Sequence, residues 1–207
     1  MQKQFVALVP VKALDAGKSR LIDIPAPERR APALAFARDT LVAVMAAPSV
    51  ARTVVVTSDP ELAGAARSWS CEVLADTGGL NDSLRSAAAQ VGDSVVVAVC
   101  ADLPALTPDD LEAALAQHQP GAGSYVADHV GTGTTAYAAP VGVFDPQFGP
   151  GSALAHRAAG ARPVVGDLPS LRRDVDTLED LMALSDHGLL GSYTCAVLAA
   201  TSLPCPG

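Results

Sequence analysis

The sequence has few of the features that mark membrane, secreted or zinc-knuckle proteins. Its longest apolar runs, such as VVVAVCA from Val95, are far shorter than the roughly 20 residues of a membrane helix. Pro10 and Lys12 interrupt FVALVPVK too early for the apolar core of a secretory signal. The four cysteines form no CxxC pair, which argues against a metal knuckle or a disulfide framework. We therefore expect a cytoplasmic protein that does not contact membranes.

Positive charge is also scarce. The chain has 14 Lys and Arg against 22 Asp and Glu, which gives a formal net charge of -8 at pH 7. Nonspecific binding to nucleic acid needs a net basic face that displaces counterions from phosphates, so we expect no nucleic-acid partner. If the substrates are anions, the positive charge that binds them must be local.

One local cluster of positive charge follows the first apolar run. The segment PVKALDAGKSRL places Lys12, Lys18 and Arg20 within nine residues, at a position where α/β proteins commonly bind phosphates. Neither GxGxxG nor GxxxxGK[ST] follows the run, so the common dinucleotide and Walker signatures are absent and an NAD-dependent oxidoreductase is disfavoured. The segment is a candidate triphosphate site, and a solvated basic loop is the alternative.

The pattern of apolar residues predicts an α/β fold. The chain has 207 residues, 49% of them hydrophobic, which suffices for one domain with a substantial core. Four Val-rich runs (FVALVPVK, RTVVVTSD, CEVLAD and SVVVAVCAD) alternate with helical stretches, as expected for strands buried on both faces of a mainly parallel sheet. The segments from Ser58 and Thr107 combine cap residues with an early proline and mark two helix starts. We predict a single doubly wound domain over residues 1–207, with an irregular tail from about residue 188.

A carboxylate, Asp102, ends the fourth apolar run. Charged groups are rarely buried without a partner, so this residue either forms a turn or holds a ligand. The crevice at the carboxyl ends of the strands also receives the loop after the first strand, and Mg²⁺ is commonly held by one or two carboxylates plus phosphate oxygens. Asp102 is therefore a candidate Mg²⁺ ligand, with a turn residue satisfied by nearby amides as the alternative.

The late segment RRDVDTLEDL supplies further carboxylates. If it is extended, period-two alternation puts Arg172, Asp174 and Asp176 on one face, where two carboxylates could complete the site that Asp102 begins. Asp176 directly precedes a capping box between Thr177 and Asp180, so a metal ligand and a helix cap both stay open for it. Asp174 has no such alternative.

Three segments rich in small polar residues are candidate substrate sites. GTGTT and FGPGS offer hydroxyls and free backbone amides to a phosphate or carboxylate, with Thr134 and Ser152 as candidates. A Gly-rich turn and a plain helix cap would explain the same residues. GLNDSL opens a helix after the third run, and Asn81 and Ser83 are candidates for reading a base or ribose, with helix capping by Asn81 as the alternative. A lone helical histidine, His156, is not counted as a site residue.

Together these segments resemble the guanylyltransferases that act on 2-phospholactate or phosphoenolpyruvate in the biosynthesis of the deazaflavin coenzyme F-420. The resemblance covers, in order and over nearly residues 5 to 185, PVKALDAGKSRL, VVVTSDP, GLNDSL, CADLPALTPDDL, GTGTT, FGPGS and LRRDVDT. It implies the nucleotidyltransferase (GT-A-like) variant of the Rossmann-like sheet, a three-layer sandwich. It also implies GTP as donor, Mg²⁺ as cofactor and pyrophosphate as leaving group.

The resemblance assigns roles to individual residues. It implies Asp102 and Asp174 as metal ligands, and Thr134, Gly149 and Ser152 as acceptor ligands. In the expected reaction Lys18 and Arg20, from the candidate triphosphate segment, offset the charge on the departing pyrophosphate. In one respect the chain departs from related branches. The first loop has Val-Lys where sugar-nucleotide and molybdopterin enzymes carry the glycines of AGGxGxR, so their mode of triphosphate binding cannot be carried over.

The acceptor is inferred from lineage. The chain has 11 Arg against 3 Lys and is dense in Ala, which suggests a high-GC genome, and family members from actinobacterial sources of that kind resemble phosphoenolpyruvate users. We therefore expect phosphoenolpyruvate as acceptor, with 2-phospho-L-lactate as the alternative. A molybdopterin or sugar-phosphate nucleotidyltransferase, and a silent nucleotide-binding module, are further alternatives. A homodimer also stays open.

Overall fold

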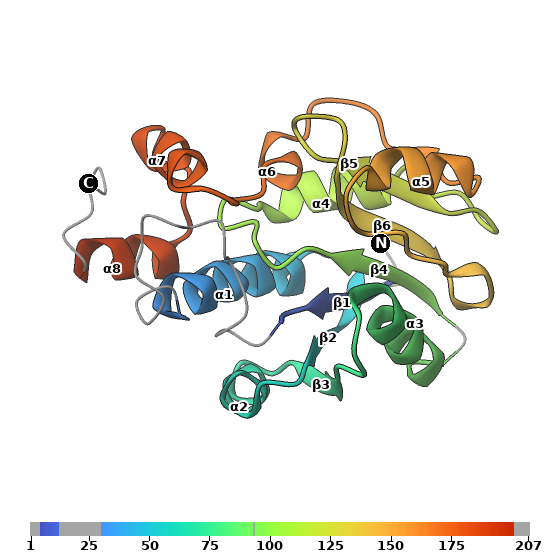
Figure 1. Cartoon of the computed structure of the whole chain (residues 1–207), viewed down its shortest axis with the longest axis horizontal. Helices are drawn as coiled ribbons and strands as arrows, with labels where there is room; N and C mark the ends of the chain where they lie inside the picture. The colour runs from blue at the N-terminus through green and yellow to red at the C-terminus, as the bar shows by residue number, and fades with distance from the viewer. Residues whose placement is uncertain (1–4, 13–29, 93, 201–207) are drawn as a thin grey trace.

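The computed structural model describes residues 5–12, 30–92 and 94–200, which form one seven-stranded sheet with helices on both faces (Figure 1). The strand order is β3-β2-β1-β4-β6-β5-β7. The strands are β1 (Phe5–Pro10), β2 (Val50–Thr57), β3 (Glu72–Ala75), β4 (Val95–Val99), β5 (Ser124–Ala127), β6 (Thr134–Pro140) and β7 (Arg162–Pro163). All neighbouring pairs are parallel except those of β6, which runs antiparallel to both β4 and β5.

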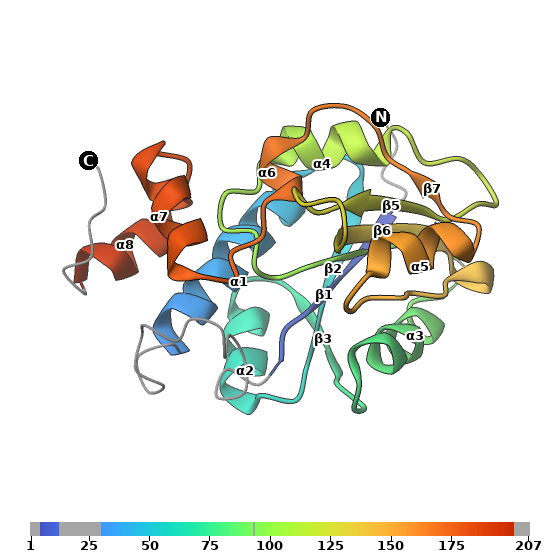
Figure 2. The same cartoon turned by 45° about the horizontal axis from the view of Figure 1, so that its top comes forward.

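The helices divide between the two faces of the sheet. They are α1 (Arg30–Ala46), α2 (Pro60–Ser68), α3 (Leu80–Gln90), α4 (Pro108–Leu115), α5 (Ser152–Ala158), α6 (Pro169–Arg172), α7 (Leu178–Asp186) and α8 (Ser192–Ala200), with a short 3-10 turn, η2 (Val141–Val143). One buried cluster joins the sheet to α1, α2, α4 and α6, and a second joins its other face to α3 and α5. Figure 2 shows α1 and α4 on one side of the sheet and α3 and α5 on the other. The prediction of a three-layer α/β fold with a mainly parallel sheet is confirmed.

The sequence pattern of the first half explains its geometry. Val runs fill β1, β2 and β4, and their side chains are buried alternately in the two clusters, as expected where helices cover both faces of a sheet. Asp59 caps α2 by accepting from the N–H groups of Glu61 and Leu62 (both 3.0 Å). Thr107 caps α4 in the same way, so both predicted helix starts are confirmed.

The expectation of an irregular tail from residue 188 is wrong for α8. A buried carboxylate of α1, Asp39, accepts from the backbone N–H groups of Tyr193 (3.1 Å) and Thr194 (2.8 Å) and so caps this helix. The guanidinium of Arg38 lies over the Tyr193 ring at 3.7 Å. Leu198 is buried in a third cluster that α1 and α7 share. The cap comes from a distant part of the chain, so no local pattern in the tail marked the helix; residues 201–207 lie outside the described residues.

Two smaller expectations also need correction. Arg172 does not begin an extended segment, because it is the last residue of α6 and its guanidinium donates to the carbonyls of Ala127 and Val164 (both 2.9 Å). Pro169 at the start of α6 favours that short helix. Helix α3 is capped at Gly79, so Asn81 is not its cap.

Candidate active site

Three carboxylates from two distant segments meet beyond the end of β4. Asp102 follows β4, and the segment after α6 brings Asp174 and Asp176 to it; one oxygen of each lies within 4.8 Å of the others. Val175, between the two late carboxylates, is fully buried, and its N–H donates to the Asp102 carbonyl (2.9 Å). The predicted alternation therefore holds over residues 174–176, with Val175 facing the core and both carboxylates facing Asp102.

This cluster fits a hard divalent cation. Its ligand atoms are all oxygens, and all three residues are only partly buried, which leaves room for water or phosphate oxygens. Oxygens bound to Mg²⁺ at about 2.0–2.1 Å lie at most about 4.2 Å apart, so carboxylate oxygens within 4.8 Å of one another need to move only slightly closer. The capping box of α7 is formed by Thr177 and Asp180, so Asp176 is not the N-cap of that helix.

A cavity of about 260 Å³ opens at the carboxyl ends of the first three strands. This is the edge of a doubly wound sheet where ligands bind. It is lined by Pro10, Val11, Lys12, Val56, Ser58, Asp76, Gly79, Leu80 and Ser83. Lys12 and Ser83, both predicted nucleotide ligands, are therefore in one place, whereas Lys18 and Arg20 lie outside the described residues and stay predictions.

The carboxylate of this cavity, Asp76, was not among the predicted site residues. Its Oδ1 accepts from the Ser83 hydroxyl and from the Gly78 N–H (2.9 Å). The hydrogen bond from Ser83, then that from Gly78, and more weakly the charge of Lys12, hold the pKa of Asp76 below its ordinary value. The sequence signal was available, because Asp76 ends the CEVLAD run as Asp102 ends the fourth run.

The other predicted base reader, Asn81, points elsewhere. Its amide donates to the Phe148 carbonyl and accepts from the Phe148 N–H (both 2.9 Å). Asn81 thus joins α3 to the FGPGS segment, in the manner of a backbone pair in a sheet.

The antiparallel strand β6 brings the GTGTT segment to the carboxylates. Because β6 runs against β4, the first residues of β6 lie beside the end of β4. The N–H of Cys100, just before Asp102, donates to the Thr135 carbonyl (2.8 Å). The Ala153 N–H donates to the Thr132 carbonyl (3.1 Å), which ties the start of α5 to the same segment. Thr134 and Ser152 are both buried there.

The expectation of free amides in GTGTT is wrong. The N–H groups of Gly131, Thr132 and Gly133 all donate to the Asp128 carboxylate, at 2.7 to 2.9 Å. Among the described residues none accepts from the Gly149 N–H, and Gly149 has a φ of 140°, a conformation that side chains disfavour. The amide available to an anion is thus in FGPGS.

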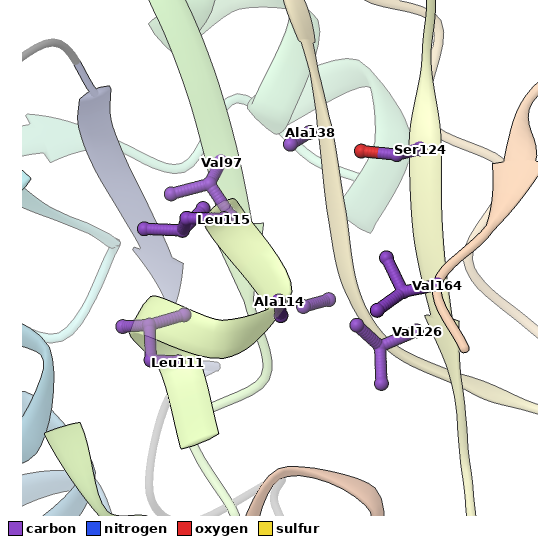
Figure 3. A pocket seen from close by; sticks show the side chains of 9 residues that line it. Val97, Leu111, Ala114, Leu115, Ser124, Val126, Ala138 and Val164 are labelled. Carbon is purple, nitrogen blue, oxygen red and sulfur yellow. The ribbon is translucent and has the colours of Figure 1, made fainter. Parts of the chain in front are cut away.

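A second cavity, between α4 and the sheet, is a packing void and not a binding site (Figure 3). Its volume is about 10 Å³, and its lining is almost wholly apolar. A void of that size holds about one water molecule at most, so it has no room for a substrate.

Comparison with known proteins agrees with this geometry. The family described as guanylyl transferase CofC like matches residues 5–199. The chain belongs to this family. Two relatives named phosphoenolpyruvate guanylyltransferase come from Salinispora arenicola (strain CNS-205) and Nocardia farcinica (strain IFM 10152). The first is 45% identical over 100% of this chain and 99% of the relative, and the second is 44% identical over 96% and 92%. The predicted resemblance is confirmed.

Solved structures support the fold alone, because their sequence identities are low. A nucleotide-diphospho-sugar transferase candidate from Desulfovibrio desulfuricans G20 superposes with a TM-score of 0.69 at 19% identity, covering 97% of this chain and 96% of that one. A nucleotidyl transferase from Methanothermobacter thermautotroptrophicus gives 0.64 at 16% identity, covering 90% and 98%. No helix in the described part of this guanylyl transferase family member is both long and apolar enough to cross a membrane.

Proposed function

We propose that this protein transfers GMP from GTP to phosphoenolpyruvate. The observation that carries the proposal is the placement of the Asp102, Asp174 and Asp176 cluster beside the GTGTT segment, in a chain 45% identical to a phosphoenolpyruvate guanylyltransferase. A phosphate oxygen of the acceptor attacks the α-phosphorus of GTP, and the bond from that phosphorus to the bridging oxygen breaks. Pyrophosphate leaves, the product is enolpyruvyl-diphospho-guanosine, and no protein nucleophile is needed.

The carboxylate cluster would hold Mg²⁺ through Asp102 and Asp174, with Asp176 within reach of the same ion. When bound, Mg²⁺ would neutralise phosphate charge on the donor and acceptor. The chain itself positions the carboxylates. The hydrogen bond from the Val175 N–H to the Asp102 carbonyl fixes the two carboxylate segments relative to each other before any substrate binds.

The cavity at the carboxyl ends of β1 to β3 is the proposed guanosine site. Guanine presents two adjacent donors, N1–H and the N2 amino group, and an ionised carboxylate is the side chain that accepts from both. Asp76 lines the cavity, and the hydrogen bonds from Ser83 and Gly78 that lower its pKa favour its ionised form. Gly78 and Ser83 donate to Oδ1, and no described residue donates to Oδ2. Asp76 is thus our candidate guanine reader, with Lys12 beside it for the phosphates.

The acceptor site is proposed at Thr134, Gly149 and Ser152. Phosphoenolpyruvate carries a carboxylate and a phosphate on adjacent groups, and two hydroxyls and a backbone amide suit such a pair of anions. The same donors would hold 2-phospho-L-lactate, because the two acids differ mainly at one carbon. The names of the Salinispora arenicola and Nocardia farcinica relatives favour phosphoenolpyruvate.

The experiment that tests this function is an incubation with Mg²⁺, phosphoenolpyruvate and each nucleoside triphosphate in turn, with pyrophosphate release measured and products weighed by mass. We expect GTP to give pyrophosphate and enolpyruvyl-diphospho-guanosine, and the other nucleotides to give far less. A silent nucleotide-binding module would bind GTP and release no pyrophosphate.

A further inference from the structure

His156 is fully buried and contacts two of the proposed acceptor ligands, Thr134 and Ser152. It is on α5, one turn after Ser152. Its ring stacks on Tyr137 (centroids 4.6 Å apart, planes 24° apart) and on Tyr125 (5.8 Å), and the Phe148 ring meets it edge-on (5.5 Å). A histidine enclosed in this way cannot touch a substrate, so any role in the reaction acts through its neighbours.

The hydrogen bonds of His156 define which nitrogen carries the proton. Nε2 accepts from the Gln147 backbone N–H (2.9 Å), so Nε2 has no hydrogen. In the neutral ring Nδ1 then carries the proton, and it points to the Ser152 carbonyl (2.9 Å). The Thr134 hydroxyl oxygen lies 3.1 Å from the same Nδ1, which has no free lone pair in this tautomer, so the hydroxyl can only accept and shares the Nδ1 proton with the Ser152 carbonyl.

This tautomer determines what Thr134 offers. Its hydroxyl oxygen accepts from His156, so the hydroxyl hydrogen is free to donate to another group. No described residue besides His156 pairs with that hydroxyl. A hydroxyl whose hydrogen has no protein acceptor, in a segment beside the carboxylate cluster, is arranged to donate to an anion.

The same ring fixes one end of the FGPGS segment. His156 accepts a hydrogen bond from the Gln147 N–H. Asn81 donates to the Phe148 carbonyl and accepts from the Phe148 N–H. Gly149, whose amide is available, follows directly in the chain. The loop is therefore anchored from α5 and from α3 immediately before the residue whose amide is proposed to meet the acceptor.

We propose that His156 is a positioning residue for the acceptor. It orients the Thr134 hydroxyl as a donor and holds the loop that carries the Gly149 amide. This inference rests on the proposed acceptor site, and it predicts that loss of the imidazole weakens acceptor binding selectively, with donor binding preserved.

The decisive comparison is between His156→Leu and His156→Asn. Leucine approximates the volume of the ring without hydrogen bonds, whereas the asparagine amide restores a donor close to the position of Nδ1. We expect His156→Leu to raise the KM for phosphoenolpyruvate about tenfold or more, with the KM for GTP within about twofold, because two net hydrogen bonds are lost. His156→Asn should recover part of that loss. Equal rises in both KM values, or no recovery in the asparagine variant, would overturn the proposal.

His118→Asn is the matched control. His118 is partly buried, packs against the Phe5 ring (5.5 Å between centroids) and lies 3.3 Å from the Ser124 hydroxyl, outside the acceptor segments. Its loss should lower thermal stability and leave both KM values near those of the wild type. If His118→Asn raises the acceptor KM as His156→Leu does, the effect is general destabilisation and the proposal fails.

Thr134→Val provides a second test of the same proposal if His156→Leu does not fold. It removes the hydroxyl that His156 orients, so it should raise the acceptor KM in the wild type and raise it by a smaller factor in His156→Asn, whose amide orients that hydroxyl only in part. Full additivity of the two changes would contradict a shared action.

Hydrogen exchange separates this proposal from the proposed function. Wild-type protein that transfers no GMP to phosphoenolpyruvate would refute the function alone. The Gln147 amide should still exchange faster in His156→Asn, because its acceptor Nε2 is gone, while the Phe148 amide, which Asn81 holds, changes less. An unchanged Gln147 amide would show that His156 does not fix the loop.

Discussion

At the scale of single residues, the carboxylate cluster would contribute negative charge to metal binding. Asp102 and Asp174 were predicted from two sequence patterns, an acidic end to an apolar run and an alternating late segment, and the structure brings one oxygen of each within 4.8 Å. An amide has the shape of a carboxylate without its charge. Replacing a single oxygen by nitrogen therefore separates metal binding from folding.

Asp102→Asn should reduce guanylyl transfer by at least about 100-fold, because several kcal/mol of charge neutralisation are lost and each 1.36 kcal/mol is a factor of ten. Circular dichroism and thermal melting should show an intact fold. Asp109→Asn, an exposed carboxylate in the first turn of α4, is the matched control and should retain wild-type rates. A folded Asp102→Asn variant with near-normal turnover would exclude the metal assignment.

Asp76→Asn should weaken the preference for guanine. Asparagine still accepts from Gly78 and Ser83 through its oxygen, but the second oxygen becomes an NH₂ group that repels guanine donors. We expect kcat/KM for GTP to fall about 10- to 100-fold, as for a lost hydrogen bond to a charged group. Inosine triphosphate lacks the N2 amino group, so its rate should fall less, and the ratio of the two nucleotides is the readout. An unchanged ratio would remove Asp76 from guanine recognition.

Two site residues, Asp76 and His156, escaped the sequence analysis for different reasons. Asp76 carries a readable signal at a strand end. A lone histidine on a helix has none, because its role depends on Gln147 and Thr134, which approach it only through the fold. Likewise, an asparagine at the start of a helix suggests a cap, and only the structure shows that Asn81 pairs with Phe148.

At the scale of elements, local sequence patterns were sufficient to predict the strands and helix starts that carry such a pattern. Val-rich runs predicted the four parallel strands, and Asp59, Thr107 and the Thr177 box predicted three helix starts. Nonlocal pairing was not predictable. The reversal of β6 between β4 and β5, and the capping of α8 by a carboxylate 154 residues away, depend on contacts between distant segments.

The docking of α8 on α1 depends on close approach as well as on the cap. A Cβ added at Gly191 would lie 2.2 Å from the Asp39 carboxyl carbon, so only glycine fits where the tail crosses α1. The N–H groups of Tyr193 and Thr194 would lose their acceptor if Asp39 were removed.

Asp39→Ala should lower the free energy of unfolding by about 1–2 kcal/mol, the usual cost of a lost helix cap. Urea denaturation measures this change, and limited proteolysis should cut the tail of the variant sooner than that of the wild type. Asp186→Ala, an exposed residue at the end of α7, is the control and should be close to neutral. Equal stability of the two variants would show that Asp39 does not secure α8.

At the scale of the whole molecule, two histidines make stability depend on pH. Burial lowers the pKa of His118, and burial also lowers that of His156 although the Ser152 carbonyl and Asp145 favour its cation. In the unfolded chain a histidine has a pKa near 6.5. Below that pH the unfolded state binds more protons than the folded state, so acid favours unfolding.

The free energy of unfolding should therefore fall as the pH drops below about 6.5, until the lowered folded pKa values are passed. Urea denaturation at several pH values from 7.5 to 5, in about 0.15 M salt to screen the net negative charge, measures this dependence. His118→Asn should show a shallower dependence than the wild type. A stability that is flat or rises toward pH 5 would contradict the neutral state of the buried histidines.

A competition between acceptors tests guanylyl transfer and the choice of phosphoenolpyruvate together. Equimolar phosphoenolpyruvate and 2-phospho-L-lactate are incubated with GTP, Mg²⁺ and limiting protein, and the guanylylated products are weighed by mass. We expect enolpyruvyl-diphospho-guanosine to dominate, with one pyrophosphate released for each product formed. Dominant guanylylated lactate would contradict the assigned acceptor, and the absence of both products would contradict guanylyl transfer itself.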